Sequence, residues 1–272
     1  MGRIWVSDSL DDLNLGHVRL LQCAAAHGPV QVLLWSDQVV QRMTGRPPKF
    51  PLEERRYAAE AIRYVDQVRV ADNLSDPRHV PVEMIPGDTW VMADSAHTAP
   101  RQDACRERNI ACVVIDDAQL AALPPVAVPP DTLRSGRKKV VVTGCFDWFH
   151  SGHIRFFEEA AEYGDLYVIV GHDRNIRELK GPGHPMFNEH HRWTMVQTIR
   201  YVTAAMISTG HGWMDAEPEI ARIRPDRYIV NEDGDRPEKR QFCAERGIEY
   251  IVLRRRPKPG LPRRESTHLR GF

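Results

Sequence analysis

The chain has 272 residues, of which 42% are hydrophobic, and this is enough for one large or two small globular domains with ordinary cores. Its 37 lysine and arginine residues equal its 37 aspartate and glutamate residues, and the pI is about 7.2. This balance excludes a global field that would recruit nucleic acid or an acidic membrane, so any anionic ligand must be held locally.

The cysteines and the N-terminus indicate a cellular compartment. The five cysteines are odd in number and form no CxxC pair, which argues against a disulfide framework or a structural zinc site. The first residues lack the apolar core of a signal peptide, and no apolar run approaches the length of a membrane span. The sequence therefore predicts a protein of the reducing cytoplasm with no membrane partner.

The first half of the chain begins with a pattern that returns later. Leu13–Asp37, with the sequence LNLGHVRLLQCAAAHGPVQVLLWSD, is similar to Phe149–Asp173, which reads FHSGHIRFFEEAAEYGDLYVIVGHD. Two further pairs follow in the same order, namely 55–65 with 192–202 and 103–115 with 241–253. Three matches in one order indicate an internal repeat and hence two tandem domains.

A linker separates the two copies. The stretch Ala122–Lys139 is rich in proline and polar residues, as linkers between domains are. We place the boundary near Asp131, which gives a first domain of residues 1–130 and a second of residues 131–272.

The second copy alternates apolar runs with helix-like stretches. The runs KVVVT, LYVIVG, AAMIST, RYIVN and EYIVL are separated by stretches typical of helices, which begin near Ser151, span Arg192 to Tyr201 and begin again at Pro237. This alternation predicts an α/β fold in which each domain is Rossmann-like, with a parallel sheet flanked by helices. Ligands of such sheets bind beyond the carboxyl ends of the strands.

One such strand end carries the stretch GCFDWFHSGH, Gly144 to His153. A helix that begins here presents unpaired N–H groups and a partial positive charge, which favour phosphate. His150 and His153 are three positions apart and share one face of the first turn, while Gly152 leaves room for a ligand to approach the backbone. The stretch therefore predicts a phosphate-binding site with two imidazole donors.

The pattern GxFDxxHxGH resembles the signature of the cytidylyltransferases, in the wider HxGH nucleotidyltransferase superfamily. The further elements of that family follow in its order, as Lys180, Arg192, Asp233 and the stretch RRESTHLR (Arg263–Arg270). The Gly-Ile pair that the family carries before its Ser-Thr is missing here. The similarity covers nearly all of residues 138–272.

The resemblance implies transfer of CMP from CTP to a small phosphorylated or phosphonate acceptor, which gives a CDP-linked product and pyrophosphate. It assigns catalysis to His150, His153 and Lys180. It assigns nucleotide binding to Cys145, Phe146, Asp147, His150, Gly152, His153, Asp233, Arg263, Ser266 and Thr267. It assigns acceptor binding to Lys180, Arg192 and Asp147. Mg²⁺ is the expected cofactor, carried by the triphosphate with no protein ligand.

The first copy lacks several of these groups. Asn14 stands in place of His150 and Thr44 in place of Lys180, although Gly16 and His17 are retained. A site without these donors is expected to be catalytically silent. Ethanolamine-phosphate cytidylyltransferases carry two such domains in one chain, and this resemblance implies an internal pseudo-dimer, so the protein is expected to be a monomeric pseudo-dimer or a homodimer.

Alternatives remain for the donor, the acceptor and the activity itself. Heptose-phosphate adenylyltransferases also carry a GCFDxxHxGH stretch, so an ATP-dependent enzyme acting on a sugar phosphate is the nearest alternative. An inactive nucleotide-binding scaffold or sensor is an alternative of another class. The loop Val230–Arg240 is expected to help select the acceptor, and its mixed charges favour no one compound. The basic run Leu253–Arg264 indicates local triphosphate contact rather than nucleic-acid binding.

Overall fold

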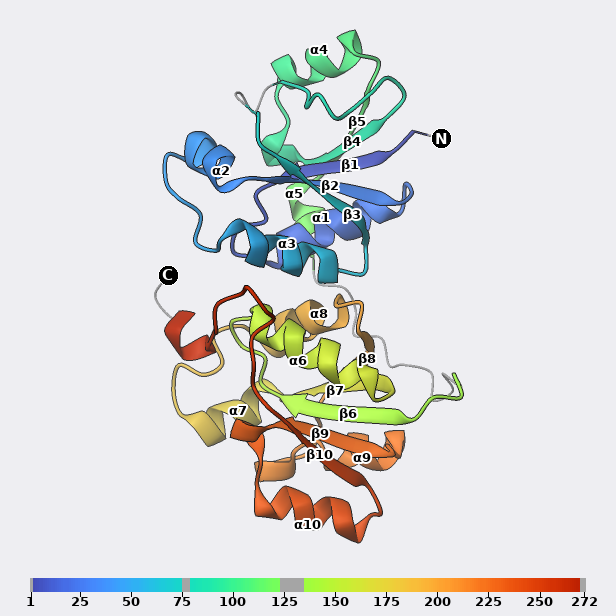
Figure 1. Cartoon of the computed structure of the whole chain (residues 1–272), viewed down its shortest axis with the longest axis vertical. Helices are drawn as coiled ribbons and strands as arrows, with labels where there is room; N and C mark the ends of the chain where they lie inside the picture. The colour runs from blue at the N-terminus through green and yellow to red at the C-terminus, as the bar shows by residue number, and fades with distance from the viewer. Residues whose placement is uncertain (1, 75–78, 123–134, 270–272) are drawn as a thin grey trace. The chain divides into compact units, whose positions relative to one another are not determined.

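The chain divides into two compact units, a first unit of residues 1–122 and a second unit of residues 123–272 (Figure 1). The computed structural model describes residues 2–74, 79–122 and 135–269. Both units are α/β, and each contains one five-stranded sheet. The boundary expected near Asp131 lies outside the described residues.

The first unit has a parallel sheet with the strand order β3-β2-β1-β4-β5. Its strands are β1 (Ile4–Asp8), β2 (Val30–Trp35), β3 (Val65–Ala71), β4 (Thr89–Ala93) and β5 (Ala111–Ile115). Its helices are α1 (Leu15–Ala25), α2 (Asp37–Thr44), α3 (Leu52–Ala61), the short 3-10 turn η1 (Asp94–Ala96), α4 (Ala99–Glu107) and α5 (Asp117–Ala121).

The second unit has a parallel sheet with the order β10-β9-β6-β7-β8. Its strands are β6 (Lys139–Gly144), β7 (Asp165–Val170), β8 (Val202–Ile207), β9 (Arg227–Asn231) and β10 (Glu249–Leu253). Its helices are α6 (Ser151–Glu162), α7 (Asp173–Lys180), α8 (Glu189–Gln197), α9 (Glu217–Ile223) and α10 (Pro237–Glu245), with the 3-10 turns η2 (Gly212–Met214), η3 (Glu232–Gly234) and η4 (Ser266–Leu269).

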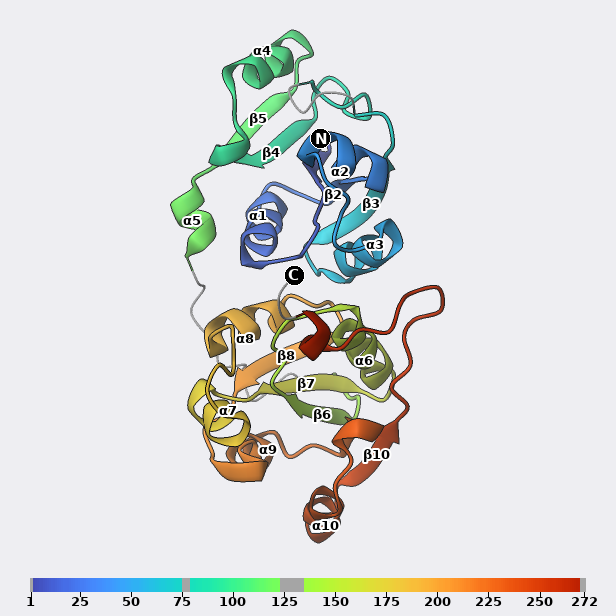
Figure 2. The ribbon, with the colours of Figure 1, turned by 90° about the vertical axis from the view of Figure 1, so that its left-hand side faces the viewer.

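The two sheets have the same topology, because β1 and β6 are the central strands and the chain reverses direction across the sheet beside each of them. In the second unit α6 and α8 cover one face of the sheet, and α9 and α10 cover the other (Figures 1 and 2). The reversal leaves a crevice beyond the carboxyl end of the central strand, which is where open α/β sheets bind ligands. The GCFDWFHSGH stretch begins at the end of β6.

The inner strands of the second sheet are apolar because both of their faces are buried. All six residues of β7 are buried, and Val140, Val141 and Val142 of β6 are fully buried. Parallel strands of this kind have continuous rather than alternating apolar sequences. Helix α6 packs on the sheet through a single apolar face that includes Ile154, Phe157 and Ala160.

The repeat extends to unusual backbone angles. Leu10 and Phe146 have φ values of 45° and 53°, and Asp12 and Trp148 have φ values of 56° and 49°. Left-handed conformations are uncommon for residues other than glycine. These left-handed residues occur at matching positions, so the loop after the central strand shares two unusual backbone angles between the units, although its sequence differs.

The helices differ from the prediction in three places. The helix expected over residues 192–201 begins and ends earlier, since Asn188 caps α8 by accepting a hydrogen bond from the N–H of His191. Helices α7 and α9 were not predicted, because both are short and rich in charge. The element near the C-terminus is a four-residue 3-10 turn, in which the Ser266 hydroxyl donates to the carbonyl of Asp147.

Two further features concern the length of the helices and the state of the cysteines. Over residues 2–74, 79–122 and 135–269, no helix combines the length and the apolar character that crossing a bilayer requires. All five cysteines are free thiols, and Cys105 and Cys243 are buried.

Candidate functional site

A cleft of about 260 Å³ lies beyond the carboxyl end of β6 in the second unit. Six predicted site residues of the loop and of the first turn of α6 line it, namely Cys145, Phe146, Asp147, His150, Gly152 and His153. Lys180 from the end of α7, Asp233 from η3 and Ser266 from η4 line it as well. The cleft thus brings together residues from four separate parts of the second unit.

His150 is held in one orientation at the start of α6. Its Nδ1 atom accepts a hydrogen bond of 3.0 Å from the N–H of Gly152 and so caps the helix. A neutral ring with an accepting Nδ1 carries its proton on Nε2. The side chain is only 5% exposed, and Nε2 is buried without a hydrogen-bond partner among the described residues. His150 therefore offers an N–H donor to a ligand in the cleft.

His153 lies parallel to His150. The ring centroids are 4.0 Å apart with an interplanar angle of 24°, and Nδ1 of His153 is also buried without a partner in the described part of the chain. Burial lowers the pKa of His150 to about 3, and the charges of Arg255 and Arg264 act in the same direction. Burial also lowers the pKa of His153 well below its usual value. Both rings are neutral near pH 7, so they can act as hydrogen-bond donors and not as fixed cations.

Two glycines make this arrangement possible. A Cβ atom on Gly152 would lie 2.8 Å from Cε1 of His150 and 2.9 Å from its Nδ1. A Cβ atom on Gly144 would lie 2.8 Å from Cζ of Phe146. Any side chain at either position would displace a ring that lines the cleft.

Asp147 lines the cleft and also holds the segment that precedes α8. Its carboxylate accepts hydrogen bonds from the N–H groups of Met186 at 2.9 Å and Phe187 at 3.1 Å, and it is almost fully buried. In the first unit, Asp11 accepts from the N–H groups of Lys49 and Phe50 in the same way. Asp147 thus positions a loop, and its oxygen atoms are already engaged.

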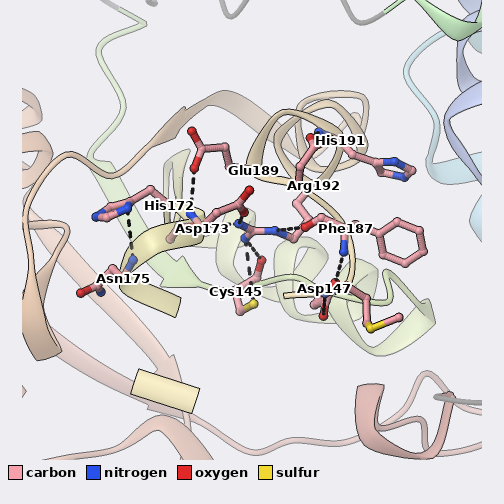
Figure 3. Close-up of polar contacts among 12 residues, drawn as sticks. Cys145, Asp147, His172, Asp173, Asn175, Phe187, Glu189, His191 and Arg192 are labelled. Atoms are coloured by element: carbon pink, nitrogen blue, oxygen red, sulfur yellow. Dashed lines mark hydrogen bonds and ion pairs between the residues drawn. The ribbon is translucent and has the colours of Figure 1, made fainter. Parts of the chain in front are cut away.

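Arg192 lies beneath the loop rather than in the cleft. Its side chain is 1% exposed. It donates hydrogen bonds of 2.6 to 2.7 Å to the carbonyl oxygens of Cys145 and Gly171 and to the Asp173 carboxylate. Its Nε atom donates to the carbonyl of Phe187 (Figure 3). These hydrogen bonds all join Arg192 to other residues of the second unit. The geometry gives Arg192 a positioning role, Arg192 is not among the residues that line the cleft, and its contact with an acceptor stays a prediction.

The remaining predicted residues differ in whether they line the cleft. Lys180 is exposed, lines the cleft and makes no ion pair with a described residue. Arg263 is 61% exposed, lies 3.1 Å from the carboxylate of Glu265 and lines a neighbouring recess instead of the cleft. The side chain of Thr267 lies outside the described residues.

Several lining residues were not predicted, and Lys239 and Arg255 are the charged ones. Lys239 donates to the carbonyl of Gly234 at 3.1 Å, and Arg255 pairs with Asp233 at 2.6 Å. Lys239 belongs to Val230–Arg240 and Arg255 to Leu253–Arg264, two segments for which the sequence indicates only the charge of the segment as a whole. Nothing in the sequence distinguishes Arg255, which lines the cleft, from the neighbouring arginines of the same run.

The cleft does not form a protein cage for a metal ion. Its carboxylates are engaged, Asp147 with backbone N–H groups and Asp233 with Arg255. In the described parts of the chain, no group of three or more His, Cys, Asp or Glu side chains is arranged to hold a metal ion. A Mg²⁺ ion would fit here through the phosphates of a bound nucleotide.

The matching region of the first unit differs in charge. Asp8 stands where the second unit has Gly144, and its Oδ1 accepts the N–H of Leu10 at 2.8 Å and lies 3.7 Å from Nε2 of His17. Asn14 caps α1 by accepting from the N–H of His17. The backbone N–H of Leu10, which corresponds to that of Phe146 in the second unit, is thus already bound by a carboxylate.

Comparison with known proteins places the second unit in a family. A cytidylyltransferase-like family model matches residues 141–257. The bifunctional protein HldE of Methylococcus capsulatus is 37% identical over 117 residues, which are 43% of this chain and 23% of HldE. The FAD synthase of Ferroglobus placidus is 36% identical over 124 residues, which are 44% of this chain and 78% of that enzyme.

A solved structure is also similar. The lipopolysaccharide core biosynthesis protein of Thermoplasma volcanium GSS1 is 25% identical, with a TM-score of 0.37, and the match covers 47% of this chain and 98% of that protein. The FAD synthase match and the family model agree with the HxGH motif and its parallel sheet. The chain belongs to the cytidylyltransferase-like family, within the HxGH superfamily of nucleotidyltransferases.

Proposed function

We propose that the second unit transfers a nucleotidyl group from a nucleoside triphosphate to the phosphate or phosphonate of a small acceptor, and releases pyrophosphate. The observation that carries this proposal is the stacked pair of neutral histidines, whose buried Nε2 and Nδ1 atoms have no partner among the described residues and which line the cleft at the start of α6. Buried polar atoms in folded proteins are nearly always hydrogen-bonded, so such atoms indicate a ligand.

The reaction needs no covalent intermediate. An acceptor oxygen, already deprotonated, forms a bond to the α-phosphorus as the bond from phosphorus to the leaving pyrophosphate oxygen breaks, and the electron pair departs with pyrophosphate. His150 and His153 would donate hydrogen bonds to the transferring phosphate, aided by the N-terminus of α6. Lys180 would align the acceptor. Mg²⁺, bound to the triphosphate, would neutralise part of its charge.

The proposal also concerns the base of the nucleotide, which is cytosine in CTP and adenine in ATP. The family description and the GxFDxxHxGH signature favour CTP. The relatives named FAD synthase are named for an adenine dinucleotide, which favours ATP, and HldE matches equally well. We infer adenylyl transfer as the first activity to test and cytidylyl transfer as the second, with sugar phosphates and other small phosphates as acceptors.

The test is pyrophosphate release by the full chain with ATP and separately with CTP, in magnesium buffer, across a panel of phosphorylated acceptors. His153→Ala should lower turnover about 100-fold or more, the usual cost of removing one preorganised donor. His17→Ala, the matching change in the first unit, should leave turnover intact. Equal turnover in the wild type and His153→Ala would refute the proposal. Tight binding of nucleotide without turnover on any acceptor would favour a sensor instead.

We further propose that the first unit is catalytically silent. The carboxylate of Asp8 binds the N–H of Leu10 and would repel a phosphate there, and Asn14 cannot replace an imidazole at the helix start. Thr44 ends α2 with its hydroxyl hydrogen-bonded to the carbonyl of Val40, where the second unit presents Lys180. The expected pseudo-dimer remains a prediction.

A further inference from the structure

The loop after β6 carries a tryptophan that has no role in the reaction as described so far. Trp148 is half-buried and lines the cleft, and its Nε1 atom is buried with no hydrogen-bond partner among the described residues. Two other buried indoles of the chain use this atom. Nε1 of Trp5 donates to the Asp88 carboxylate at 2.8 Å. Nε1 of Trp193 donates to the carbonyl of Ala205 at 2.9 Å. Because buried indole N–H groups usually have a partner, the unpaired N–H of Trp148 indicates a ligand.

The indole ring of Trp148 is held from two sides. Its φ is 49°, and Asp12 at the matching position of the first unit has a φ of 56°, so this backbone conformation belongs to the loop rather than to the side chain. The ring meets that of Phe187 edge to face, with centroids 5.2 Å apart and an interplanar angle of 77°. The preceding residue, Asp147, binds the N–H groups of Met186 and Phe187 (Figure 3). Backbone and ring thus contact the same segment, and the N–H donor has a defined position.

The contacts of Trp148 lie on the β7 side of the cleft. Lys180 and His184 line the cleft and belong to the stretch between β7 and α8 that also contains Phe187. Asn231 follows β9 and lines the cleft as well, and β7 and β9 lie on opposite sides of β6 in the sheet. Because Lys180 is the residue proposed to align the acceptor, the indole N–H belongs to the acceptor's side of the cleft.

The chemistry of the indole narrows the ligand. An indole N–H only donates, so its partner must offer a lone pair. The neighbouring carboxylate of Asp147 is already engaged by two backbone N–H groups. In the proposed reaction, the group that enters on this side is the phosphate or phosphonate of the acceptor, and hydrogen bonds to an ionised partner are about twice as strong as those between neutral groups. A neutral donor orients such an anion while withdrawing less charge from the attacking oxygen than a second cation would.

We propose that Trp148 is an acceptor-binding residue, whose Nε1–H donates a hydrogen bond to a non-attacking oxygen of the acceptor's phosphate or phosphonate. This inference rests on the proposed function, because it names a contact for the acceptor of that reaction. The first unit has the carboxylate of Asp12 at this position, 2.8 Å from Nζ of Lys49. An anion would be repelled there, which agrees with a silent first unit.

Titration of the full chain with inorganic phosphate tests the proposal. The protein is first saturated with Mg²⁺ and the α,β-methylene analogue of ATP or of CTP, so that the probe cannot occupy the place of the triphosphate. Trp148→Phe removes the N–H and keeps an aromatic ring, and it should weaken phosphate binding about 10- to 100-fold, which corresponds to one hydrogen bond to a charged group. Trp193→Phe is the matched control. It makes the same change in a ring that donates to Ala205, so it should lower the unfolding temperature and leave phosphate binding unchanged.

The indole N–H can also be followed directly by nuclear magnetic resonance in the full chain with isotope-labelled tryptophan. The Trp148 indole signal is the one missing from the spectrum of Trp148→Phe. Saturating phosphate should shift it downfield, and further than the other indole signals, because a hydrogen bond to an anion deshields the proton. If Trp148→Phe fails to fold, variants of the other five tryptophans assign the signal, and the wild-type titration still tests the contact.

The outcomes separate this inference from the proposed function. If the wild type binds neither nucleotide analogue, the proposed function is overturned and the inference with it. If a nucleotide binds but phosphate does not, or phosphate binds without shifting the Trp148 signal, or phosphate binds Trp148→Phe equally well, only the role of Trp148 is overturned. A purely structural role would weaken nucleotide and phosphate binding alike in Trp148→Phe, which also contradicts the proposal. A loss confined to phosphate, together with a shifted indole signal, supports it.

Discussion

Arg55 and Arg192 occupy matching positions in the two units and bind the same set of groups. Each Nε atom donates to the carbonyl of a phenylalanine, Phe50 or Phe187, and each Nη2 atom donates to an aspartate, Asp37 or Asp173, at 2.7 Å. Each Nη1 atom also donates at 2.6 Å to the carbonyl of the residue that follows the central strand. The arginine is present in the unit that lacks the histidine pair, so its contacts serve the fold of the loop.

Replacing either arginine should destabilise the unit that contains it. Arg192→Ala would leave a carboxylate and several carbonyl groups without their partner, which costs about 3 kcal/mol or more. Arg55→Ala should cost a similar amount in the first unit. Urea unfolding combined with amide hydrogen exchange of the peptides from each sheet would measure both. A stable Arg192→Ala variant with weaker acceptor binding alone would instead support the acceptor role predicted from the sequence.

Gly152 and Gly16 offer a matched pair of substitutions at the two helix starts. In Gly152→Ala the new methyl group would meet the His150 ring at 2.8 Å, and this ring is held by its hydrogen bond and by stacking on His153. In Gly16→Ala the nearest atom would be Oδ1 of Asn14 at 3.3 Å, a contact that a shift of a few tenths of an ångström would relieve. We expect Gly152→Ala to lower turnover about 10- to 100-fold, since small displacements of aligned groups are costly, and Gly16→Ala to leave it unchanged. Steady-state kinetics of both variants tests this expectation. Equal turnover in Gly152→Ala and Gly16→Ala would contradict the close contact expected between a residue at position 152 and the His150 ring.

The buried histidines predict a pH dependence of stability. The pKa of His150 is about 3 in the folded protein, against about 6.5 for an unfolded histidine. Between these values the unfolded chain binds a proton that the folded chain does not, so the stabilisation is complete above pH 6.5 and is lost as the pH falls toward 3. The free energy of unfolding should decrease from pH 7 to pH 5, and less steeply in His150→Gln. His79→Gln, an exposed histidine of the first unit, is the control. An unchanged slope in His150→Gln would show that His150 is not buried as a neutral ring.

The parallel sheets and the HxGH loop could be predicted from the sequence because their signals are local. Buried strands such as β7 appear as continuous apolar runs, and the two histidines are separated by only two residues. The repeat itself was visible as aligned segments. These features require no knowledge of which distant residues meet.

The roles of individual charged residues could not be predicted in the same way. Arg192 opens a helix in the sequence, but its partners come from three separate loops. Arg255 and Arg263 belong to one basic run, and only the fold determines that Arg255 faces Asp233 while Arg263 faces solvent. The match between Arg55 and Arg192 contained a usable signal, since an arginine retained in a copy without the catalytic groups points to structure rather than to catalysis.

The charge of Asp8 leads to a prediction about stoichiometry. Its carboxylate binds the N–H of Leu10 and lies 3.7 Å from His17, so a phosphate entering the first unit would meet a like charge where the second unit presents Gly144. Calorimetric titration of the full chain with ATP or CTP and Mg²⁺ should therefore give one site per chain. The affinity of that site should fall at least about tenfold in His153→Ala and stay constant in His17→Ala. Two equivalent sites, or a loss of affinity in His17→Ala, would show that the first unit binds nucleotide despite Asp8.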